Sequence, residues 1–208
     1  MKQYEFYLTQ YEQDNFFKPI RDKFDAIKLL MDIVKYVKLY EDIEEKSHCN
    51  CKLILRIDKS SRVFLISDGK YISMTFPFSV LHKDKSINFY SKNVDDIDIA
   101  LASQIITFVQ DKKIRENGDE SDFFDLITSP DNDLGFWLLL KELIFSEDGY
   151  LRYDYDPEHV SGDVHPLYHY DIFYSSQCTF KIGINKNISH AEMIDLLDLT
   201  TACHFVKY

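Results

Sequence analysis

The segment Tyr150-Leu-Arg-Tyr-Asp-Tyr-Asp156 decides the fold, because ionisable side chains alternate along it with leucine and tyrosine. Successive side chains of a β-strand point to opposite faces of a sheet. The alternation therefore predicts a strand that carries Arg152, Asp154 and Asp156 on one face and the apolar and aromatic side chains on the other.

Two further strands and a helix are expected after this segment. Aromatic and β-branched residues favour strands at about 167–174 and 177–184, joined by a short turn at Ser175-Ser176. Ser189, with Glu192 three residues later, forms a capping box and predicts the start of a final helix.

The N-terminal half contains the same two kinds of element. Asp68-Gly69 is a tight-turn sequence between two runs of β-forming residues and predicts a hairpin over 63–76, with another strand at 51–57 and a short one near 87–90. Helical spacing of apolar residues predicts helices over about 20–40, 94–113 and 134–145. The last is apolar nearly all round and is expected to be buried centrally. The fold class predicted is α+β: an antiparallel sheet of hairpins with helices packed on one face.

The length predicts a single domain over 1–208, since 208 residues that are 45% hydrophobic can bury a core without disulfides or metal. The alternative is two lobes, an N-terminal one over 1–115 and a C-terminal one over 134–208. The polar stretch 114–133 between them is expected to be a mobile loop or a partner-contacting excursion.

The formal net charge of −11 bears on partners. Net repulsion disfavours non-specific binding to nucleic acid, whereas an acidic chain suits a basic protein partner or mimicry of DNA charge; its simplest effect is solubility. The N-terminus has no signal-peptide pattern and no apolar run is long enough to span a bilayer, so we expect a cytoplasmic protein without membrane contact.

The cysteines predict no complete metal site. Cys49 and Cys51 are separated by one residue, which is closer than the usual zinc spacing, and His48 beside them has no second ligand pair to complete the set. Cys178 is left open as a partner for His169 in a Cys–His dyad, although its alternation favours the core.

The C-terminal strands carry the candidate site. Asp154 or Asp156, facing His169 or Asp171 across a hairpin, would have β-carbons about 5 Å apart. Carboxylates and an imidazole in that array could hold Mg²⁺ or Mn²⁺, with Asp154, Asp156 and His169 as ligands. A lysine on the adjoining strand would stabilise developing negative charge, so the candidate catalytic residues of a metal-dependent nuclease or phosphodiesterase are Asp154, Asp156, His169, Asp171 and Lys181. The candidate binding residues are Arg152, His159 and His165.

Two considerations weaken this hypothesis. Thr179 stands where the common acid-x-Lys pattern of nucleases needs an acid. In addition, one face of an antiparallel sheet is often solvated, and surface ion pairs on such a face contribute under about 1 kcal/mol. A different metal site, made by His165 and His169 together, is disfavoured because on one strand these residues would lie roughly 13 Å apart, too far to share a metal.

The order Arg152-Tyr-Asp-Tyr-Asp-Pro157, His165-Pro166 and His169, followed by a strand and a terminal helix, resembles a bacterial protein family of unknown function. The resemblance covers the C-terminal part only. It implies a bacterial or phage-related protein encoded near defence or mobile genes, and it implies no reaction. The leading hypothesis is a cytosolic accessory or interaction protein of such a module; the alternative is the metal-dependent phosphodiesterase.

Overall fold

The computed structural model describes residues 1–41, 51–83, 86–116, 134–174 and 180–205. The chain divides into two compact units. The first unit combines residues 1–18, 43–75 and 149–208, and the second combines residues 19–42 and 76–148. Each unit therefore draws on segments from both sides of residue 115.

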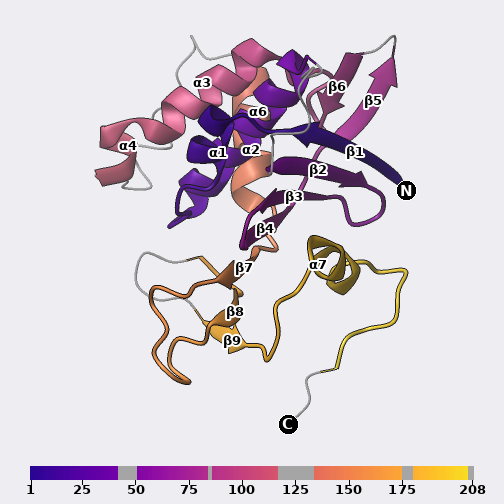
Figure 1. Ribbon diagram of the computed structural model, residues 1–208. Helices are drawn as coiled ribbons and strands as arrows, with labels where there is room; N and C mark the ends of the chain where they lie inside the picture. Colours follow the sequence, from indigo (N-terminus) through magenta and orange to yellow (C-terminus); the bar gives the residue numbers. More distant parts are fainter. Residues whose placement is uncertain (42–50, 84–85, 117–133, 175–179, 206–208) are drawn as a thin grey trace. The chain divides into compact units, whose positions relative to one another are not determined.

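The first unit contains a seven-stranded sheet in the order β1-β2-β3-β4-β7-β8-β9, in which every neighbouring pair is antiparallel (Figure 1). Its strands are β1 (Lys2–Tyr7), β2 (Lys52–Ile57), β3 (Arg62–Ser67), β4 (Lys70–Thr75), β7 (Leu151–Tyr155), β8 (Tyr168–Asp171) and β9 (Lys181–Gly183). The predicted hairpin is confirmed, because β3 and β4 pair around Gly69, whose φ of +72° suits glycine.

The two faces of this sheet differ in chemistry. One face carries Ile54, Phe64 and Ile66, which pack with Tyr71 and with the C-terminal helix α7 (His190–Leu196). The opposite face is apolar along β2 to β4 and becomes ionic along β7 to β9. The change from apolar to ionic residues occurs between β4 and β7, where Ile72 lies opposite Arg152 and Lys70 lies opposite Asp154.

Helix α7 begins where the sequence predicts. Ser189 is the N-cap, its hydroxyl accepts from the Glu192 backbone N–H, and the Glu192 carboxylate accepts from the Ser189 backbone N–H at 2.8 Å. Met193 is fully buried and packs in one cluster with Leu151, Tyr153 and Ile188. The capping box therefore places an apolar helix face on the sheet.

The second unit contains the longer helices and a two-stranded sheet of β5 (Ser79–Lys83) and β6 (Ser86–Tyr90). Its helices are α2 (Lys23–Leu39), α3 (Ile99–Gln110), α4 (Lys112–Glu116) and α6 (Leu134–Phe145). Helix α3 begins later than predicted, because the Asp98 carboxylate caps it by accepting from the Leu101 backbone N–H at 2.7 Å.

The prediction that the helix over 134–145 is buried centrally is wrong. Leu134 and Phe145 are 71% and 80% exposed, and only one stripe of α6 is buried: Phe136, Leu139, Leu140 and Leu143. The strands β1 and β5 and the helix α1 (Gln10–Phe16) were not predicted. None of the described helices is both long and apolar enough to cross a membrane. The predicted α+β class with an antiparallel sheet is confirmed.

Candidate functional site: an ionic cluster on three strands

The strand register brings the predicted residues of β7, β8 and β9 together. Asp154 lies opposite His169, and Asp171 lies opposite both Arg152 on β7 and Lys181 on β9. All five side chains therefore project from the same face of the sheet. We call these five residues the ionic cluster. The cross-strand arrangement expected from the alternation is confirmed.

The ionic cluster is not a solvated surface. Asp154 is 6% exposed, and His169 and Asp171 are fully buried. The interpretation of these residues as ordinary surface ion pairs is therefore wrong. Only the two cationic side chains are partly exposed, at 22% for Arg152 and 23% for Lys181.

Each cation of the cluster bridges two buried partners. The Arg152 guanidinium donates to Asp154 Oδ2 at 2.7 Å through Nε and to Asp171 Oδ2 through its terminal nitrogen. The Lys181 ammonium donates to Asp171 Oδ1 at 2.9 Å and to His169 Nε2 at 2.8 Å. Two cations thus balance two carboxylates, which is the condition under which buried charge is tolerated.

His169 is held in one orientation by its own loop. Its Nδ1 lies 2.8 Å from the backbone carbonyl oxygen of Pro166 and donates to it, which leaves Nε2 as the acceptor for Lys181. The His165 ring packs edge-on against His169, with centroids 4.8 Å apart. The expected separation of roughly 13 Å between these histidines is wrong, because His165 precedes β8 and lies outside the extended strand.

Asp156 belongs to a second group, in the loop after β7. Its carboxylate accepts from the His159 backbone N–H and lies 2.9 Å from His159 Nδ1 and 3.3 Å from His165 Nε2. Although desolvation acts in the opposite direction, the hydrogen bonds from His159 and the charges of His159 and His165 lower the pKa of Asp156. The rings of His159 and His165 stack with centroids 6.1 Å apart, so the three histidines form a row.

Charge within the cluster also affects its neighbours. Burial acts against the charged form of Arg152, but Tyr150, Asp154 and Asp171 raise its pKa. On the opposite face of the sheet, Tyr153 stacks on Tyr71 with centroids 5.1 Å apart, and burial raises the pKa of Tyr170 to about 12. These phenols therefore stay protonated at neutral pH and pack as part of the core.

Three residues of the cluster have the side-chain arrangement of a metal site. One ligand atom each from Asp154, His169 and Asp171 lies within 4.8 Å of the others. The predicted ligand set contained Asp156 in place of Asp171; Asp156 is not a member of this group. Carboxylate oxygen and imidazole nitrogen together suit a first-row divalent transition metal.

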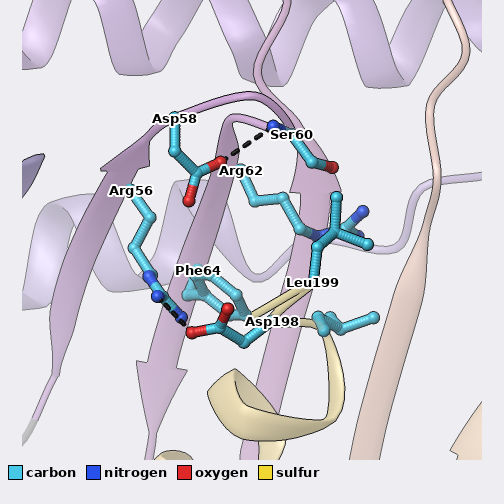
Figure 2. Close-up of a pocket in the computed structure, with 8 residues that line it drawn as sticks. Arg56, Asp58, Ser60, Arg62, Phe64, Asp198 and Leu199 are labelled. Carbon is cyan, nitrogen blue, oxygen red and sulfur yellow. Dashed lines mark hydrogen bonds and ion pairs between the residues drawn. The ribbon is translucent and has the colours of Figure 1, made fainter. Parts of the chain in front are cut away.

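A small pocket on the α7 face of the sheet was not predicted. Figure 2 shows Arg56 and Arg62 lining it, with Asp58 and Ser60 from the β2–β3 turn and Asp198 from the segment after α7. Arg56 and Arg62 lie directly opposite each other, which is unfavourable for like charges unless each has its own acceptor.

Both arginines have such acceptors. Arg56 donates to Asp198 Oδ2 at 2.5 Å, and Arg62 donates to Ser73 Oγ at 2.9 Å and to the Gly149 carbonyl. The contact between Arg56 and Asp198 attaches the segment after α7 to the sheet. The local sequence contains no pattern that joins Arg56 to Asp198, because the two residues are separated by 142 positions.

Two cysteine hypotheses lie outside the described residues, since the structure describes neither His48 and Cys49 nor Cys178. Cys51 is buried without a disulfide.

Comparison of the chain with protein-family models, curated proteins and solved structures gave no match. The fold defines an α+β protein with an antiparallel sheet, and a statement about activity depends on the site itself.

Proposed function

We propose that this chain is an interaction protein, of the bacterial accessory class implied by the resemblance of its C-terminal sequence. The observation that supports it is an exposed apolar patch at the β9 edge of the sheet, which we call the edge patch: Phe173, Phe180 and Ile182. These side chains are 59%, 59% and 41% exposed. Contiguous exposed apolar side chains are typical of binding surfaces, whereas single ones are common everywhere.

The edge patch extends the apolar face of the sheet. Ile182 lies opposite Tyr170, and the Ile172 N–H donates to the Phe180 carbonyl at 3.2 Å, so Phe180 and Ile182 share the face of Tyr170. The Phe173 and Phe180 rings meet edge to face with centroids 6.0 Å apart. Aromatic side chains held in this way supply large contact area at low cost in conformational entropy.

The ionic cluster supports the same proposal by its internal pairing. Arg152 and Lys181 already donate to the buried carboxylates and to His169. In this structure the two cations therefore direct their hydrogen bonds across β7, β8 and β9 to residues of the cluster itself. The net charge of −11 favours a partner with a basic surface around an apolar centre.

The proposal is tested by purifying the native chain from cells that encode it and measuring its size in solution. We expect it to co-elute with a stoichiometric protein partner. The double variant Phe180→Ser/Ile182→Ser should release that partner while the melting temperature stays within a few degrees. Tyr11→Ser is the matched control, because Tyr11 is 74% exposed on α1. A monomer without partner, or a partner retained by the double variant, would contradict the proposal.

The second candidate function is the metal-dependent phosphodiesterase. One observation favours it: Asp154, His169 and Asp171 gather with Lys181 on one face, as a metal-assisted hydrolysis would require. The test is hydrolysis of bis(p-nitrophenyl) phosphate and of single-stranded DNA and RNA with Mn²⁺ or Mg²⁺. Turnover that disappears in Asp171→Asn supports this candidate, and equal background rates for both proteins count against it.

A further inference from the structure

The Lys181 ammonium occupies the position of a cation within the ionic cluster. It lies 2.8 Å from His169 Nε2 and 2.9 Å from Asp171 Oδ1, which are two of the three atoms suited to ligate a metal. The third ligand residue, Asp154, has its Oδ2 3.7 Å from the same imidazole nitrogen. One positive charge is therefore already held by two of the three ligand residues.

We propose that Asp154, His169 and Asp171 form a binding site for a first-row divalent transition metal, and that Lys181 is the competing cation that fills it in the metal-free protein. Metal binding then releases the Lys181 ammonium from His169 and Asp171. The inference is independent of the proposed interaction function and does not require turnover.

The imidazole is prepared for a metal. Because His169 Nδ1 donates to the Pro166 carbonyl, Nε2 is the nitrogen that the neutral ring offers to a metal, and metal-binding histidines are commonly fixed by such a contact. Arg152 holds the remaining oxygen of Asp171 and so orients this ligand from outside. These contacts fix two of the three ligands before any metal arrives.

A second observation concerns the Asp154 carboxylate. Asp154 Oδ1 is buried and has no hydrogen-bond donor, and Lys70 Nζ lies 3.9 Å from it. A metal bound through Asp154 Oδ1 would compensate the desolvation penalty of this oxygen, while Oδ2 keeps its contact with Arg152. The internal pairing seen in the cluster is therefore incomplete at Asp154.

Lys181 is suited to leave. It lies on the three-residue edge strand β9, and its side chain is 23% exposed, so the ammonium can turn to water without separating β9 from β8. The ligand set combines nitrogen with carboxylate oxygen, which favours Zn²⁺ or Mn²⁺ over Ca²⁺ and Mg²⁺.

The experiment measures Zn²⁺ and Mn²⁺ binding by calorimetry and by thermal melts, in a His159→Gln background that removes the exposed histidine of the neighbouring loop. We expect Lys181→Met to bind at least tenfold more tightly than the parent, because the competing charge is gone. Adding His169→Gln to that variant should abolish binding. Ca²⁺ should shift neither melt.

Folding is checked separately by circular dichroism, and Lys181→Gln replaces Lys181→Met if the latter does not fold. In the parent protein, excess Zn²⁺ should move the ¹⁵N chemical shift of His169 Nε2 to that of a metal-bound nitrogen. Folded Lys181 variants that bind no tighter than the parent, or binding that survives His169→Gln, would overturn the inference. If a variant lost the protein partner but still bound metal, the inference about the metal site would stand.

Discussion

Asp154 and His169 lie directly opposite each other on β7 and β8, and both are buried although ionisable residues alternate along these two strands. An unpaired buried charge would destabilise the fold. The cations Arg152 and Lys181 around Asp154 and His169 are therefore needed for stability. Both cations share one carboxylate, that of Asp171.

Asp171→Asn should lower the free energy of unfolding by about 2 to 3 kcal/mol. Asp171 is fully buried and accepts from both Arg152 and Lys181, so its neutralisation leaves two cations without their common partner. The partial exposure of the cations keeps the loss below that of a fully buried pair. Urea unfolding measures the change, and Asp163→Asn in the exposed loop is the control; equal stability of both variants would show that the pairing contributes nothing.

Gly183→Ala should destabilise the sheet edge by about 1 to 3 kcal/mol, because an added methyl group forces an overpacked contact. A β-carbon at Gly183 would lie 2.9 Å from Pro166 Cγ and 3.3 Å from Pro166 Cβ. Since the Pro166 carbonyl holds His169, the same change should disturb the imidazole. Thermal melts of Gly183→Ala, of Pro166→Ala and of the double variant Gly183→Ala/Pro166→Ala test this. The double variant should recover part of the stability that Gly183→Ala loses. Strict additivity would argue against the contact.

Asp98→Ala should destabilise the second unit by about 1 kcal/mol, the usual cost of losing a helix N-cap. The Asp98 carboxylate accepts from the Leu101 backbone N–H at 2.7 Å. Asp95→Ala removes an exposed acid just before the helix and serves as the control for charge. Denaturant unfolding should separate the two variants, and indistinguishable midpoints would contradict the capping role.

Acid should weaken the N-terminal cap of α7 between pH 4.5 and 2. The hydrogen bond from Lys186, followed by those from the Ser189 backbone and hydroxyl, lowers the pKa of Glu192 from 4.5 to about 2. A carboxyl with a depressed folded-state pKa stabilises above its unfolded pKa, and this contribution disappears as pH falls through the folded value. Melting temperatures of the parent and of Glu192→Gln should therefore converge across this window. A constant difference down to pH 2 would show that Glu192 does not titrate this way. Added salt should reduce the effect, because the pair is exposed.

Period-two patterning predicted the ionic cluster because β7 and β8 are regular antiparallel strands. Asp154 opposite His169 follows from alternation and pairing alone. Burial did not follow, because the sequence contains no pattern showing that His165 and Pro166 lie next to His169. The position of the Asp156 side chain was also not predictable. Strand β7 ends at Tyr155, and the loop that follows brings the His159 backbone N–H to the Asp156 carboxylate.

Long-range charge pairs were the least accessible part of the fold. Arg56 and Asp198 meet because α7 returns the chain across the sheet, and no local periodicity encodes that return. By contrast, Asp68-Gly69 and Ser189 with Glu192 act through neighbouring backbone groups, so the hairpin and the start of α7 could be predicted.

The shortness of β9 has one more consequence. An exposed apolar edge strand ordinarily promotes aggregation, because it can pair with the edge strand of another copy. Each added chain then presents a new edge strand to the next, and fibrils grow. Strand β9 has only three residues, its Lys181 side chain is directed to the buried Asp171, and Gly183 lies close to Pro166, so β9 is too short to template fibril growth. The β9 edge of the sheet can therefore expose apolar side chains without making the protein polymerise.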